Sequence, residues 1–322
     1  MSAAPDVSIV IPSRDRWELL SRHALPSALS QESVELEVVV VDDGSEDPVS
    51  DRIAEFDDLR LRVVRHDIPR RLPGARNAGA EVACGNWLAF LDDDDVWSPR
   101  KLRAQLDTAC ASGSAWAYGR AVVVDGSLTV IESDPFPEPT ELAGLLLGGN
   151  WVPGGGSNVI VRADAFAAAG GFDEELRFFE DWDLWLRLLD AGLPAACDEV
   201  VMARVEHGAN MVVRDRERVA SAFERVLAKR RVVTDADRKA VNEWLAFEQH
   251  RAGDRLGASR LYLRTVVSCR SPGNLVPAVG ALFGTRGMEL ASRLLVATRG
   301  ISHLDVERRA PPTEPDWLAG YR

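Results

Sequence analysis

The chain has 322 residues, of which 46% are hydrophobic and 27% charged, and its formal net charge is −12. This length and apolar content predict one large globular domain with a smaller one beside it. The acidic balance argues against a general nucleic-acid binder, because phosphate binding needs a basic surface. Four cysteines far apart in the sequence argue against a zinc site or a disulfide framework, and they favour a reducing cytoplasm.

The amino-terminal sequence has no signal-peptide pattern, and no window reaches the roughly twenty apolar residues of a transmembrane helix. The late apolar segments 275–283 and 290–297 are short, so they indicate at most peripheral contact with a membrane. We therefore expect a cytoplasmic protein, with the inner face of the membrane as an alternative location.

The first hundred residues alternate apolar, strand-length runs with helical stretches. Strands are predicted at 7–11, 37–41, 61–65 and 87–91, and helices at 17–30 and 75–83. Right-handed crossovers place such strands in one parallel sheet with helices on both faces. Ligands of such sheets bind beyond the carboxyl ends of the strands.

Three polar segments directly follow these strands: PSRDR at 12–16, VDDGSED at 41–47 and DDDD at 92–95. They should converge on one edge of the sheet, where carboxylates suit a hard divalent cation such as Mg²⁺ or Mn²⁺. VDDGS is also typical of an ordinary capped turn. The alternative for the four aspartates is an exposed acidic turn before a helix that begins near Ser98 and Pro99, which explains the Ser-Pro but not four carboxylates.

Five segments in order resemble the inverting nucleotide-sugar glycosyltransferases of family 2, which have the GT-A fold. They are VSIVIPSRDR, EVVVVDDGS, GARNAG, NWLAFLDDDDVWSP and GGFDEELRFFEDWDLWLRLLDAG. The resemblance implies an α/β domain over 1–214, with a mostly parallel, Rossmann-like sheet flanked by helices. Its donor half would span about residues 1–100 and its acceptor half about 101–214.

The resemblance also assigns the donor side of the site. It implies that Asp43 contacts the nucleobase, that Asp94 binds Mn²⁺ or Mg²⁺, and that Asp92 and Asp93 face ribose and sugar. Further donor contacts would come from Pro12, Ser13, Arg14, Arg76 and Asn77. For Arg76 the alternative is an ordinary surface arginine. Without a bound cation, the acidic cluster is expected to be strained or mobile, because adjacent carboxylates repel.

The helix predicted at 180–192 begins with two acidic residues, which could simply complement its dipole. The resemblance instead makes Asp181 the general base for the acceptor hydroxyl and lets Glu180 position acceptor or sugar. Candidates for the acceptor or sugar wall are Trp151, Gly155, Gly156, Ser157, Asn158 and Trp182. His207 could be a third metal or phosphate contact, or a structural histidine.

Beyond residue 214 the sequence is rich in Arg, Ala and Leu, which predicts a helical region over 215–309. One helical pair with Gly253 at its turn resembles a tetratricopeptide unit. Its predicted roles are packing on the first domain, homodimer formation or acceptor docking. The tail 310–322 is expected either to be disordered or to pack through Trp317.

The predicted function is therefore a metal-dependent, inverting glycosyltransferase. Its donor would be a nucleoside diphosphate sugar, with UDP favoured, and its acceptor a hydroxyl on a glycan, a lipid or a natural product. The alternatives are a non-catalytic nucleotide-sugar binding module and a sugar-phosphate nucleotidyltransferase. The last would need a Gly-rich basic loop after the first strand, and PSRDR is not one.

Overall fold

The computed structural model describes residues 4–206, 216–230, 234–299 and 314–322. The chain divides into two compact units. One unit comprises Met1–Ala143, Val152–Glu206 and Pro311–Arg322, and the other comprises Gly144–Trp151 and His207–Ala310. The helical unit thus includes a short stretch from the middle of the chain, which the sequence placed in the first domain.

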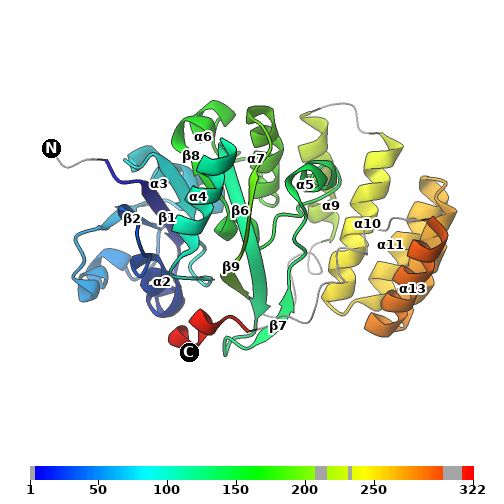
Figure 1. The fold of residues 1–322 in the computed structure, drawn as a ribbon. Coiled ribbons are helices and arrows are strands. Elements are labelled where there is room, and N and C mark those ends of the chain that lie inside the picture. Colours follow the sequence, from blue (N-terminus) through cyan, green and yellow to red (C-terminus); the bar gives the residue numbers. More distant parts are fainter. Residues whose placement is uncertain (1–3, 207–215, 231–233, 300–313) are drawn as a thin grey trace. The chain divides into compact units, whose positions relative to one another are not determined.

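The first unit is built on a sheet of nine strands (Figure 1), with the order β3-β2-β1-β4-β8-β6-β9-β5 and β7 paired to β6. The strands are β1 (Val7–Ser13), β2 (Leu36–Asp42), β3 (Leu61–Arg65), β4 (Trp87–Phe90), β5 (Val96–Trp97), β6 (Trp116–Val124), β7 (Val130–Ser133), β8 (Ile160–Arg162) and β9 (Ala195–Val205). The first four lie where the sequence predicted strands.

The sheet is parallel in its first half and mixed in its second. Strand β1 pairs in parallel with β2 and β4, and β2 pairs in parallel with β3. Strand β8 pairs antiparallel with β4 and β6, and β9 is parallel to β6 and antiparallel to β5. In the parallel half, Ser13 is opposite Asp42 and Asp42 is opposite Arg65, so the polar segments after these strands emerge at one edge.

Helices of the first unit connect the strands. They are α1 (Trp17–Leu19), which continues through one wide turn into α2 (Leu25–Leu29), α3 (Arg71–Val82), α4 (Lys101–Ser112), α5 (Pro139–Leu145), which extends into the second unit, α6 (Ala163–Ala169) and α7 (Glu180–Leu188). Helix α4 begins later than predicted because Ser98, directly after β5, is held by other hydrogen bonds. The Ser98 N–H donates to the carbonyl of Val201 in β9, and the Ser98 carbonyl accepts from the Gln31 side chain.

Close packing of α3 against the sheet depends on Gly79. A Cβ at this position would lie 2.3 Å from a methyl carbon of Val10 in β1 and 3.0 Å from one of Val41 in β2. Such distances are far inside van der Waals contact, so only glycine allows this approach. Arg76, three residues before Gly79, is on the same buried face of α3.

The second unit stacks consecutive helices. They are α9 (Arg216–Ala228), α10 (Asp235–Arg251), α11 (Arg255–Ser268), α12 (Leu275–Leu282) and α13 (Gly284–Arg299). Thr234 and Asp237 form a reciprocal capping box at the start of α10, and Gly253 has a φ of +80° at the turn into α11. No helix in the described part of the chain is long and apolar enough to cross a membrane.

The carboxy-terminal residues return to the first unit as a short 3-10 turn, Asp316–Tyr321, drawn in red in Figure 1. The Trp317 indole N–H donates to the carbonyl of Val200 at 3.1 Å, and the Tyr321 hydroxyl lies 2.7 Å from that of Ser30. Leu318 is fully buried. This segment packs against the hydrophobic cluster that includes Val96 and Val205.

Candidate active site

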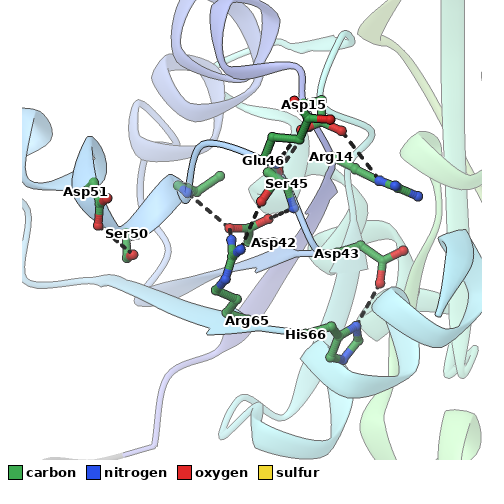
Figure 2. A network of polar contacts seen from close by, with 11 residues as sticks. Arg14, Asp15, Asp42, Asp43, Ser45, Glu46, Ser50, Asp51, Arg65 and His66 are labelled. Atoms are coloured by element: carbon green, nitrogen blue, oxygen red, sulfur yellow. Dashed lines mark hydrogen bonds and ion pairs between the residues drawn. The ribbon is translucent and has the colours of Figure 1, made fainter. Parts of the chain in front are cut away.

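Asp42 ends β2 and is a structural residue. Its carboxylate accepts hydrogen bonds from the backbone N–H groups of Ser45 (2.8 Å) and Val49 (3.0 Å), and it pairs with Arg65 of β3 (Figure 2). Burial alone would raise the pKa of Asp42, but these hydrogen bonds outweigh burial and lower it. The carboxylate therefore fixes the turn that follows β2.

Asp43 points to the other side of the strand end, toward His66 (Figure 2). Its carboxylate is 2.8 Å from the His66 Nδ1 and accepts from the backbone N–H groups of Arg70 and Arg71, each at 2.8 Å. These contacts hold the start of α3 at the sheet edge. The predicted contact of Asp43 with a nucleobase stays a prediction.

The four aspartates after β4 point to different partners. Asp92 pairs with Arg76 at 2.6 Å, whereas Asp93 and Asp94 both pair with Arg16, at 3.0 and 2.6 Å. The buried carboxylate of Asp95 accepts from the backbone N–H of Val205 at 3.1 Å. Two arginines thus compensate carboxylates that the sequence analysis expected to stand uncompensated without a cation.

Compensation at Asp93 is incomplete. Its carboxylate also accepts a hydrogen bond from the Ser13 hydroxyl at 2.8 Å. Burial nevertheless raises the pKa of Asp93 to about 7, against the opposing effects of Arg16 and Ser13. Burial likewise raises the pKa of Asp95 well above its usual value. In both groups burial therefore favours the neutral, protonated form over the charged carboxylate.

Arg76 links this acidic loop to helix α7. Its guanidinium, only 2% exposed, contacts Asp92 at 2.6 Å and Glu180 at 2.9 Å. Burial would lower the pKa of Arg76, but Asp92, Glu180 and Asp181 outweigh burial and raise it, so the side chain stays charged. The alternative of an ordinary surface arginine is thus wrong. Arg76 lies on the side of α3 that packs against the sheet. The residue pattern around 75–83 does not show which side of the helix that is.

Glu180 and Asp181 open α7 directly after Phe179, whose φ is +64°. Burial, and next the charge of Asp181, raise the pKa of Glu180 to about 7 although Arg76 opposes the shift. The Arg76 guanidinium is thus shared between the carboxylates of Asp92 and Glu180. Asp181 is less buried than Glu180, and its carboxylate accepts from the N–H of Trp182 at 2.7 Å.

The glycine run 154–156 brings the chain close to these groups. A Cβ at Gly156 would lie 2.8 Å from an Arg76 guanidinium nitrogen, and one at Gly155 would lie 3.3 Å from the Asp181 carboxylate. Gly155 also has a φ of +57°, which favours glycine. The run therefore lets backbone pass beside the predicted base and its neighbouring ion pairs.

The end of this segment, Ser157 and Asn158, accepts hydrogen bonds from buried side chains. The Trp97 indole N–H donates to the Ser157 carbonyl at 2.7 Å, and the Lys101 amine donates to the Asn158 carbonyl at 3.0 Å. The Ser157 hydroxyl accepts from the backbone N–H of Asp92 at 3.0 Å. The predicted wall residues Ser157 and Asn158 are both fully buried, and Ser157 supports the acidic loop.

The other predicted wall and donor residues have contacts of their own. Asn77 exchanges two hydrogen bonds of 2.9 Å with the backbone of Phe172. Trp182 is fully buried, and Trp151 belongs to the second unit, where its ring lies 5.7 Å from that of Phe247. Pro12 is buried at the end of β1, and Arg14 is exposed. Their ligand roles stay predictions, and His207 lies outside the described residues.

Arg16, in the PSRDR segment, is a site residue to which the sequence pattern assigned no role. The available signal was a basic residue one strand away from four aspartates. Besides pairing with Asp93 and Asp94, Arg16 lines a groove of about 600 Å³ between the segments that follow β1 and β2. Asp15, Trp17 and Ser45 line the same groove.

The donor atoms of the acidic loop suit a hard cation. In the described part of the chain, no three His, Cys, Asp or Glu side chains converge on a metal position. Mg²⁺ and Mn²⁺ sites beside a nucleotide need only one or two protein carboxylates, because phosphates and water complete the shell. Asp92 and Asp94 offer such oxygens, with side chains 34% and 15% exposed.

Solved structures identify the class of fold. A crystal structure of S. aureus TarS 1-349 in complex with UDP aligns over 94% of this chain and 89% of its own, with a TM-score of 0.59 and 18% identity. The mannosyltransferase PcManGT from Pyrobaculum calidifontis, in complex with GDP-Man and Mn²⁺, aligns over 93% of this chain and 82% of its own, with a TM-score of 0.52 and 17% identity. The fold is that of the GT-A glycosyltransferases.

The sequence narrows the class to a family. The model of glycosyl transferase family 2 matches residues 8–168, half of the chain, and the chain belongs to this family. This confirms the predicted membership.

Two curated proteins illustrate the similarity. The chain is 42% identical to the succinoglycan biosynthesis protein ExoO of Rhizobium meliloti (strain 1021) over 120 residues, which are 37% of this chain and 34% of ExoO. It is 36% identical to the Escherichia coli UDP-Glc:alpha-D-GlcNAc-diphosphoundecaprenol beta-1,3-glucosyltransferase WfaP over 192 residues, 59% of this chain and 72% of WfaP. The match thus spans about a third of the length of ExoO.

Proposed function

We propose that the protein is a metal-dependent, inverting glycosyltransferase. It transfers a sugar from a nucleoside diphosphate sugar, with UDP favoured, to a hydroxyl on a glycan, a lipid or a natural product. One observation carries the proposal: buried Arg76 binds both Asp92 of the acidic loop and Glu180, next to the predicted base Asp181. The UDP in a TarS structure and the GDP-Man and Mn²⁺ in the PcManGT structure support the donor class and the metal.

In this proposal Asp181 takes the proton of the acceptor hydroxyl as that oxygen attacks the anomeric carbon. Attack from the face opposite the diphosphate inverts the configuration. A single carboxylate is sufficient, because a diphosphate leaving group needs no general acid, unlike the leaving group in glycoside hydrolysis. The Arg76 ion pairs keep Glu180 and the start of α7 in place, so Asp181 keeps its orientation.

Asp94, helped by Asp92, is the proposed holder of Mn²⁺ or Mg²⁺. When bound, the cation offsets the negative charge that develops on the departing diphosphate. Arg16 already places a positive charge against Asp94 and Asp93. Ser13 fixes the second oxygen of Asp93, so the orientation of that carboxylate does not depend on Arg16 alone.

The test measures donor binding and turnover separately. The melting temperature is recorded against a panel of nucleotide sugars with and without Mn²⁺, because a ligand of the native state raises it. Release of nucleoside diphosphate is then measured with the donor that stabilises most. We expect Mn²⁺-dependent release that Asp94→Ala abolishes.

Asp107→Ala is the control, because Asp107 lies on an exposed side of α4 with its side chain 66% exposed. It should leave both binding and release unchanged. Tight donor binding without release, over a broad panel of alcohol acceptors, would favour the nucleotide-sugar binding module instead. Absence of any stabilising nucleotide sugar would contradict both functions.

A further inference from the structure

The last three helices of the second unit have a charge opposite to that of the whole protein. Residues 255–299 contain seven arginines and one acidic residue, Glu289, which gives a net charge of +6 in a chain of net charge −12. Arg264, Arg270 and Arg286 are exposed. The catalytic proposal uses none of these residues.

The same helices expose large apolar side chains. Among the described residues, nine of fifteen exposed large hydrophobic side chains lie between 256 and 294. The exposed fractions are 80% for Val267 in α11, 70% for Phe283 after α12 and 59% for Leu290 in α13. Single exposed apolar residues are common on protein surfaces, but a group of this density marks an interaction site.

Helices α12 and α13 form a groove of about 670 Å³ at the centre of this group. Gly280 and Gly287 bring the helices together, since a Cβ at Gly287 would lie 2.2 Å from the Gly280 carbonyl oxygen. The groove is lined by Leu275, Val279, Phe283, Leu290 and Leu294, with Arg286 beside them. Apolar side chains therefore flank a close helix contact and have a basic residue at their border.

We propose that α11, α12 and α13 form a docking surface for an anionic phospholipid bilayer. Exposed apolar side chains enter the interfacial region of a bilayer, and arginines are attracted by its negative surface potential. A second copy of this chain is disfavoured as the occupant, because two segments of net charge +6 would repel. The inference goes beyond the proposed function and depends on neither donor nor acceptor.

The test is co-sedimentation of the full chain with vesicles of phosphatidylcholine alone, or of phosphatidylcholine and phosphatidylglycerol in equal amounts. We expect binding to the anionic vesicles that weakens as salt is raised, because salt screens the attraction. Val279→Ser/Phe283→Ser should weaken that binding about tenfold or more, since it removes apolar surface that would leave water. Both side chains are at least half exposed, at 50% and 70%, so the variant should fold.

The matched control is Leu59→Ser/Ile131→Ser, which removes two exposed apolar side chains, 102% and 57% exposed, from the first unit. It should bind vesicles like the unchanged protein. The proposal is overturned if anionic vesicles do not bind the protein, or if both double variants bind equally well. It is also overturned if sedimentation velocity shows a dimer that only Val279→Ser/Phe283→Ser dissociates, because a second copy then covers the surface.

Discussion

Two acidic segments at the same edge of the sheet differ in what binds their carboxylates. After β2, Asp42 and Asp43 accept hydrogen bonds from the backbone N–H groups of four residues. After β4, the side chains of Asp92 and Asp94 are paired with the arginine side chains of Arg76 and Arg16. Asp42 and Asp43 also contact the side chains of Arg65 and His66, but their backbone donors are fixed by the fold.

This difference in hydrogen-bond partners distinguishes carboxylates that hold the fold, after β2, from carboxylates that could bind a ligand, after β4. Hydrogen bonds lower the pKa of Asp42, whereas burial raises the pKa of Asp93 to about 7. The first segment is stable as it stands. In the second, burial favours the protonated form of Asp93, and a cation bound beside it would favour the charged form.

The largest expected effect tests whether the Asp181 carboxylate, near Arg76, is the catalytic base. Asp181→Asn should lower transfer by about 10²- to 10⁴-fold, the usual contribution of a positioned base, and leave donor binding near normal. Initial rates and donor titrations with the stabilising nucleotide sugar measure the two quantities. The control, Asp190→Asn, changes an exposed aspartate just beyond α7 and should keep full activity. Equal rates in the two variants would remove the assignment of the base.

The next effect is on stability. Arg76→Met leaves the buried carboxylate of Glu180 and the partly exposed carboxylate of Asp92 without this partner, and removing one member of a buried pair costs about 3–5 kcal/mol. Urea unfolding measures the free-energy change. Arg103→Met, which breaks the exposed pair with Asp107, should cost less than about 1 kcal/mol. If Arg76→Met lowered the free energy of unfolding no more than Arg103→Met, Arg76 would not be the residue that links the acidic loop to α7.

The third effect is the pH dependence of stability that arises from Glu180. Its pKa is raised to about 7 in the folded protein, above the ordinary value of 4.5, so the folded state holds a proton that the unfolded state releases. Stability should therefore fall as pH rises from about 5 to 8, by on the order of 1–3 kcal/mol from this group.

Glu180→Gln removes that contribution, because glutamine does not titrate. The difference in free energy of unfolding between the variant and the unchanged protein should grow in favour of the variant from pH 5 to pH 8. A constant difference, measured by urea unfolding at both pH values, would contradict the raised pKa.

The smallest effect tests whether Arg16 competes with a cation. Arg16→Gln removes the ion pair with Asp94, so Mn²⁺ binding to the protein without donor should tighten about two- to fivefold, as expected for a partly exposed ion pair. Electron paramagnetic resonance of free Mn²⁺ measures this directly. Arg14→Gln, at a neighbouring exposed arginine, should have no effect. Weaker Mn²⁺ binding in Arg16→Gln would mean that Arg16 supports the cation site.

Local patterns in the sequence were enough to predict the strands of the parallel half and most helices. β-branched runs indicated β1, β2 and β3, and the turn at Gly253 follows from the freedom of glycine at positive φ. The order of five short segments identified the family. These features depend on residues that are close together along the chain, so the sequence alone predicts them.

Only the tertiary structure decided which charges meet. Arg76 lies 16 residues from Asp92 and 104 from Glu180 along the chain, and no periodicity predicts that pairing. The burial of Arg76 and the approach of Gly155 and Gly156 to the same group depend on how α3, α7 and the glycine run pack together. The sequence determined the residue types available to the site. Their protonation and partners were decided by burial and by distances across the fold, because electrostatic energies depend on separation and solvent access.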